Sequence, residues 1–79
     1  MSRLSINYTV KDINGKHDVN ELKRGLGSLS GVISVSVNNK NQKIAVDFDT
    51  TGVQPKQLEM KIEEMGYDIT HMQFASLIM

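Results

Sequence analysis

Two stretches of the chain decide its fold, VNELKRGLGSLSGVISVSV at residues 19–37 and LEMKIEEMGYDI at residues 58–69. In each stretch, apolar residues recur at the spacing of one helix face, a glycine follows, and an extended segment comes next. An alternating segment precedes each helix, so the order strand, helix, strand occurs twice. This repeat predicts a compact architecture of two layers, a sheet covered by helices.

Length, charge and cysteine content narrow the class of protein. The chain has 79 residues and predicts a single domain over residues 1–79, because so short a chain buries only about 60–65% of its unfolded surface. Nine basic and nine acidic side chains cancel, so no net charge attracts nucleic acid or an anionic membrane. No apolar run is long enough for a signal peptide or a membrane span, so we expect a cytoplasmic protein. The absence of cysteine excludes disulfides and thiolate ligands.

The first half of the chain predicts a strand, a loop and a helix. Residues 3–10 alternate between polar and apolar side chains, the period of a strand with one buried face. Residues 11–17 lack apolar periodicity and predict a loop. We expect Asp18 to cap the helix, with Glu21 completing a capping box, and Gly31 to end it in the left-handed conformation.

The second half predicts a hairpin, a second helix and a last strand. The expected elements are strands at residues 32–37 and 44–48, a helix at 55–65 and a strand from residue 67. Pro55 suits the first position of the helix, and Gly66 closes it. The pattern leaves open whether the apolar tail, residues 75–79, extends the last strand, frays or covers the sheet.

These elements predict the α+β ferredoxin-like βαββαβ sandwich, a four-stranded antiparallel sheet with two helices on one face. The fold alone does not assign a function. RNA-binding domains of this topology stack bases on aromatic residues, and none stands at the expected outward positions, Ser5, Asn7, Thr9, Ala45 and Asp47. No nucleophile with a nearby base is indicated either, so we expect neither RNA binding nor catalysis.

Several segments together resemble the heavy-metal-associated domain of copper chaperones and copper-transporting ATPases. The resemblance covers Asn7 to about Ile69, and its residues are VKDINGKHD at 10–18, SGV at 30–32, VSV at 35–37, IAVDFD at 44–49 and IEEMGYDI at 62–69. In that family the first loop carries Gly-Met-Thr-Cys-x-x-Cys, and both cysteines bind copper(I). Counted back from Gly31, the cysteine positions fall on Gly15 and Asp18, and the methionine position on Ile13.

The resemblance therefore implies a metal loop that lacks its ligands. Copper(I) prefers sulfur, whereas Asp18 offers hard oxygen and Gly15 has no side chain. A harder site of His17 and Asp18 would hold a divalent metal or copper weakly, and it would need a third ligand or a second chain. We favour the simpler interpretation, in which Asp18 caps the helix, His17 is a solvated loop residue and no cofactor is certain.

Two further features of the resemblance have two interpretations each. Tyr67 resembles the aromatic residue beside the family's metal loop, and it either walls the small pocket around Gly15 and Asp18 or opens the last strand as an ordinary half-buried tyrosine. Basic side chains of the first helix either dock an acidic partner or are simply solvated, and these are Lys16, Lys23 and Arg24.

The resemblance implies a degenerate heavy-metal-associated-like domain linked to copper or heavy-metal homeostasis. Such a domain would act by protein–protein contact, with weak metal binding at most. Its expected partner is a copper-transporting ATPase or another metal-handling protein, with no nucleic acid and no membrane. The alternative is a regulatory or scaffold module of the same fold, without a metal role, that dimerises through its exposed edge strands.

Overall fold

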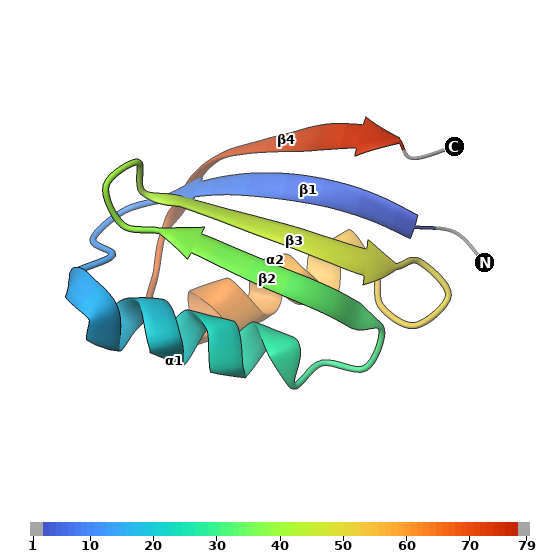
Figure 1. Cartoon of the computed structure of the whole chain (residues 1–79), viewed down its shortest axis with the longest axis horizontal. Helices are drawn as coiled ribbons and strands as arrows, with labels where there is room; N and C mark the ends of the chain where they lie inside the picture. The colour runs from blue at the N-terminus through green and yellow to red at the C-terminus, as the bar shows by residue number, and fades with distance from the viewer. Residues whose placement is uncertain (1–2, 78–79) are drawn as a thin grey trace.

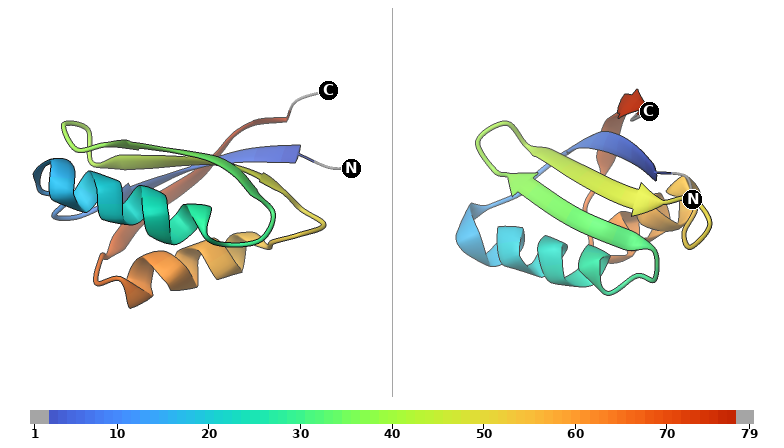
Figure 2. Two further views of the ribbon diagram at one scale, coloured as in Figure 1. Left: turned by 60° about the horizontal axis from the view of Figure 1, so that its bottom comes forward. Right: turned by 45° about the vertical axis from the view of Figure 1, so that its right-hand side comes forward.

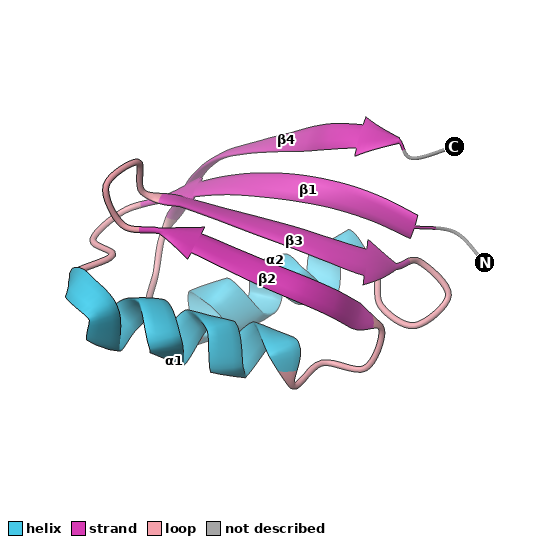
Figure 3. Cartoon of the chain, viewed as in Figure 1, coloured by secondary structure: helices cyan, strands magenta, loops and turns pink. Residues whose placement is uncertain are grey.

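The computed structural model describes residues 3–77. Its elements are β1 (Arg3–Val10), α1 (Gly15–Gly27), β2 (Val32–Asn38), β3 (Lys43–Asp49), α2 (Pro55–Glu64) and β4 (Ile69–Leu77). The strands pair antiparallel in the order β2-β3-β1-β4. Both helices cover one face of this sheet (Figures 1 and 3). The predicted ferredoxin-like architecture is confirmed, and no helix within residues 3–77 is both long and apolar enough to cross a membrane.

The core lies between the helices and the sheet because apolar side chains alternate along the strands. The fully buried side chains include Ile6, Tyr8, Ile44, Val46 and Phe48 from the strands and Leu22, Leu26, Leu58 and Ile62 from the helices. The Tyr8 hydroxyl donates a hydrogen bond to the Pro55 carbonyl at 3.2 Å, so its buried polar atom is satisfied. Burial also raises the pKa of Tyr8 above its ordinary value, with a smaller contribution from the charge of Glu59.

The start of α1 differs from the sequence prediction. Its N-cap is Asn14, so the prediction that Asp18 caps the helix in a capping box with Glu21 is wrong. Asp18 lies in the first turn, where its carboxylate accepts a hydrogen bond from the Asn14 N–H at 2.8 Å. Asp18 thus lies inside the helix, which begins three residues earlier at Gly15, and its carboxylate bonds a backbone N–H that has no partner within the helix.

The end of α1 also comes earlier than predicted, at Gly27 rather than Gly31. Ser28 is the C-cap, and its hydroxyl donates to the Gly25 carbonyl at 2.7 Å. Gly31, at φ +96°, lies in the connection to β2, where a Cβ would stand 2.8 Å from the backbone of Gly52. Because Gly31 has no side chain, the connection between α1 and β2 can pack directly against the connection between β3 and α2.

The remaining boundaries lie close to the predicted ones. The last helix ends one residue earlier, at Glu64, and β4 begins at Ile69 rather than Tyr67, a difference that is common at element ends. Residues 75–77 continue β4, so this part of the apolar tail extends the last strand. Residues 78–79 lie outside the described part of the chain.

Candidate functional site

The loop between β1 and α1, residues 11–14, is held by three other segments. The side chain of Gln42, in the turn between β2 and β3, forms two hydrogen bonds with the backbone of Ile13. Its Oε1 accepts from the Ile13 N–H at 2.9 Å, and its Nε2 donates to the Ile13 carbonyl at 2.9 Å. The Lys11 N–H donates to the Asp68 carbonyl at 3.0 Å. Together with the bond from Asn14 to Asp18, these contacts fix the loop on the body of the protein.

Gln42 is the residue of this site that the sequence analysis missed. Its backbone has φ +57°, and its Nε2 also donates to the Asn39 carbonyl at 2.6 Å. Because Ile13 is only 3% exposed, its backbone groups need partners inside the protein, and the Gln42 carboxamide supplies both. A polar residue in a polar turn gives no sign of this bond, which joins positions 29 residues apart.

Asp18 and Tyr67 come together from distant parts of the chain. Burial raises the pKa of Tyr67 to about 12, and the nearby carboxylates of Asp18 and Glu21 add to the rise. The phenol is therefore a neutral donor over the physiological pH range. Tyr67 is half-buried, lies in the connection before β4 and is close to Asp18 at the start of α1.

His17 does not join Asp18. Its Nε2 lies 2.8 Å from the Glu21 Oε2, one helical turn away, and its side chain is 83% exposed. Gly15 has φ +68°, and a Cβ added to it would meet nothing within 4 Å, so this position opens to solvent. Within residues 3–77, no three His, Asp or Glu side chains converge as metal ligands. The two residues of the predicted pair therefore have different partners: His17 contacts Glu21, and Asp18 accepts a hydrogen bond from the Asn14 N–H.

The exposed side of α1 carries three basic side chains, Lys16, Lys23 and Arg24. None of them pairs with a carboxylate in the described part of the chain. An exposed cation without a partner in its own chain keeps its full charge available to a docking surface. We name these two regions together the α1 face: the start of α1 with its loop, residues 11–18, and the basic residues Lys23 and Arg24.

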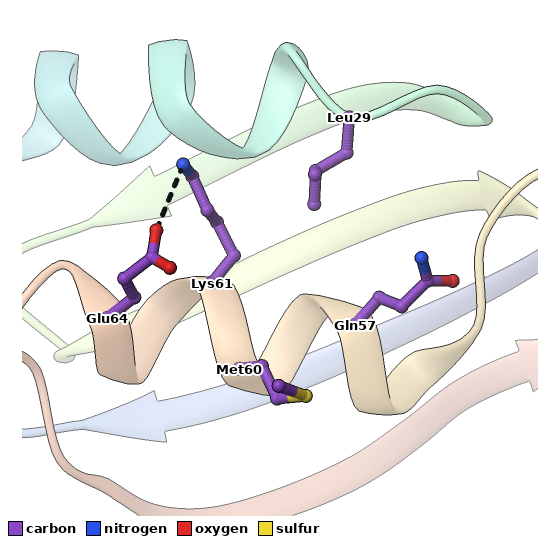
Figure 4. A pocket seen from close by; sticks show the side chains of 5 residues that line it. All are labelled: Leu29, Gln57, Met60, Lys61 and Glu64. Atoms are coloured by element: carbon purple, nitrogen blue, oxygen red, sulfur yellow. Dashed lines mark hydrogen bonds and ion pairs between the residues drawn. The ribbon is translucent and has the colours of Figure 1, made fainter.

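A separate shallow groove lies between the turn after α1 and α2. Its lining residues are Leu29, Gln57, Met60, Lys61 and Glu64. Figure 4 shows Lys61 and Glu64 on the same side of α2, where the Lys61 Nζ lies 3.5 Å from the Glu64 Oε1. No residue of the first loop contributes to the groove, so it is distinct from the α1 face.

Comparison with protein families places the chain. The model of the heavy-metal-associated domain matches residues 7–68, which is most of the sequence. The chain therefore belongs to the heavy-metal-associated domain family, a non-enzymatic family linked to heavy-metal homeostasis. Since the sequence contains no cysteine, it lacks the family's usual metal-binding motif.

Individual relatives agree with this assignment. The copper chaperone CopZ of Enterococcus hirae is 35% identical over 60 residues, which cover 76% of this chain and 87% of that protein. The copper chaperone CopZ of Bacillus subtilis shows the same 35% identity over 60 residues and the same coverage of 76% and 87%. A solution structure of a putative copper-ion-binding protein from Bacillus anthracis superposes with a TM-score of 0.83 at 26% identity, covering 87% of this chain and 97% of that one.

Proposed function

We propose that this protein docks on a metal-handling protein through the α1 face and does not itself carry copper(I). The partner we propose is the metal-binding domain of a copper-transporting ATPase in the cytoplasm. The observation that carries the proposal is the environment of Asp18, the residue at the family's second cysteine position. Its carboxylate already accepts a hydrogen bond from the Asn14 N–H and lies close to Tyr67, so it serves the loop's structure.

The charge of the loop supports a docking role. Two thiolates around one copper(I) ion would give this loop one net negative charge. The Asp18 carboxylate stands at the second cysteine position and supplies one negative charge there without a metal. The other charged residues of the loop are Lys11, Asp12 and Lys16, so residues 11–18 carry no net charge and Asp18 reproduces the charge of a loaded metal site only locally.

The shape of the loop supports the same role. Gln42, Asp68 and Asp18 each hold one part of residues 11–14. A surface that is already ordered loses little conformational entropy when a partner binds it. The basic side chains Lys23 and Arg24 extend the surface and complement an acidic partner.

The test is a titration of the isotopically labelled chain with the metal-binding domain of a copper-transporting ATPase from the same organism, followed by amide chemical shifts. We expect shifts in residues 11–18 and around Arg24. The double variant Lys23→Glu with Arg24→Glu should weaken binding at least about tenfold, because like charges then face the acidic partner.

A matched control changes the net charge equally at another place. Arg3 lies at the start of β1 and Lys56 at the start of α2, and both are exposed. The double variant Arg3→Glu with Lys56→Glu should bind nearly as well as the natural sequence. Equal weakening by both double variants, or no binding by the natural sequence, would contradict the proposal.

A further inference from the structure

The outer edge of β4 is open. In the sheet order β2-β3-β1-β4 this strand has one neighbour, β1, so backbone N–H and C=O groups along its other side have no strand partner. Figure 2 shows its C-terminal part running past the helices together with the start of β1. With 9 residues it is the longest strand of the sheet.

This edge lacks the features that usually protect a sheet from pairing. The sequence of β4, ITHMQFASL, contains no Lys, Arg, Asp, Glu or Pro. Exposed edge strands are commonly guarded by charged residues or proline, which oppose pairing with another strand. Two copies of β4 would therefore meet without repulsion between charges.

Apolar side chains are exposed along the same strand. Phe74 is 51% exposed and Met72 is 40% exposed. Their register partners in β1 are Ile6 and Tyr8, both in the core, so Met72 and Phe74 stand on the helix side of the sheet.

The opposite edge, β2, is a weaker candidate. Its strand is also uncharged, but α1 packs against it, and its exposed large apolar residue is Ile33 alone. Ile33 lies at a register shift between Val32 and Ser34, where the regular ladder is interrupted. Pairing of β2 with β4 would also leave a free edge at each end and produce open chains of molecules rather than a closed pair.

We propose that the outer edge of β4 is a dimerisation surface, on which the β4 strand of a second copy of this chain pairs antiparallel to extend the sheet across a twofold axis. Regular pairing with β1 runs from His71 to Phe74, between two register shifts. A twofold axis at Gln73 places Met72 of each copy opposite Phe74 of the other, on the same face. Sulfur and aromatic ring then meet twice across the interface.

The oligomeric state tests this surface without reference to the proposed function. Sedimentation of the natural chain from micromolar to millimolar concentration should show a monomer–dimer equilibrium. Phe74→Glu should raise the dimer dissociation constant at least about tenfold, because each interface gains two buried charges. Ile33→Glu, a change at a similarly exposed residue of β2, should leave the constant unchanged. If Phe74→Glu fails to fold, Met72→Lys makes the same test.

The register has its own test. The chain contains no cysteine, so Gln73→Cys introduces a single thiol that should form a disulfide-linked dimer under mild oxidation. Ser36→Cys, an exposed position on β2, is the control and should remain largely monomeric. The proposal is overturned if the natural chain stays monomeric at millimolar concentration, if Phe74→Glu and Met72→Lys leave a dimer intact, or if Ser36→Cys cross-links faster than Gln73→Cys.

Discussion

Asp18 stands at the position of the family's second cysteine, and its carboxylate holds the backbone of the loop instead of a copper ion. Its carboxylate accepts a hydrogen bond from the Asn14 N–H at the start of α1 and lies close to Tyr67, which comes from the other end of the chain. A metal ion at Asp18 would compete with the Asn14 N–H for the carboxylate oxygens. The residue that the resemblance aligns with a cysteine is therefore better explained by folding than by metal binding.

The substitution Asp18→Ala tests this explanation. We expect the free energy of unfolding to fall by about 1 kcal/mol, the usual cost of losing a bond to a free N–H at a helix start. The pKa of Tyr67 should also fall part of the way from about 12 toward its ordinary value of 10.0, because the nearby Asp18 carboxylate is removed. Denaturant unfolding and the ultraviolet absorbance of the phenolate measure the two effects.

The pH dependence has a definite sign. The pKa of Tyr67 is higher in the folded protein than its ordinary value of 10.0, so the stability it contributes is complete below pH 10.0 and is lost as the pH rises through about 12. Glu21→Gln is the control, since the Glu21 charge is the smallest cause of the shift. An Asp18→Ala protein with unchanged stability but weaker binding of a divalent metal would instead identify Asp18 as a ligand.

Gln42 acts between elements, since it ties the β2–β3 hairpin to the loop before α1. Replacing it with alanine removes both hydrogen bonds to Ile13, whose backbone is buried. We expect a loss of about 1–3 kcal/mol and rapid hydrogen exchange at the Ile13 amide. The Val10 amide, which bonds the backbone carbonyl of Gln42, should stay protected and serves as an internal control. Equal exchange of both amides would show that the whole turn had opened.

The elements differ in how well the sequence predicts them. Periodicity identifies strands and helices because each buries one face, and the alternation of Ile6, Tyr8 and Val10 is confirmed in the core. Periodicity does not predict the start of α1, because the Asp18 carboxylate bonds the N–H of Asn14, four residues earlier, rather than an N–H later in the helix. It does not predict the hydrogen bonds of Gln42 either, since a contact between a side chain and a distant backbone group leaves no periodic pattern in the sequence.

The molecule has the ferredoxin-like fold of its family, the heavy-metal-associated domain family, but lacks the two cysteines that bind metal in that family, since its sequence contains no cysteine. The open face of the sheet is polar where Ser5 and Ser34 donate hydrogen bonds to Asp47. The α1 face and the β4 edge lie on different parts of this scaffold, so one copy can use both.

The whole protein can therefore be tested as a scaffold for copper(I). In competition with a tight copper(I) chelator, the natural chain should take no metal, because it contains no sulfur ligand at the loop. The double variant Gly15→Cys with Asp18→Cys should take the metal, since thiols at the start of α1 have lowered pKa values.

The same substitutions lower the stability of the variant. Gly15 has φ +68°, where a side chain costs roughly 1–2 kcal/mol, and the hydrogen bond between Asp18 and Asn14 is lost. Its amide spectrum must therefore first show a folded protein. A folded variant that binds copper(I) no better than the natural chain would mean that this loop has lost the family's geometry along with its ligands.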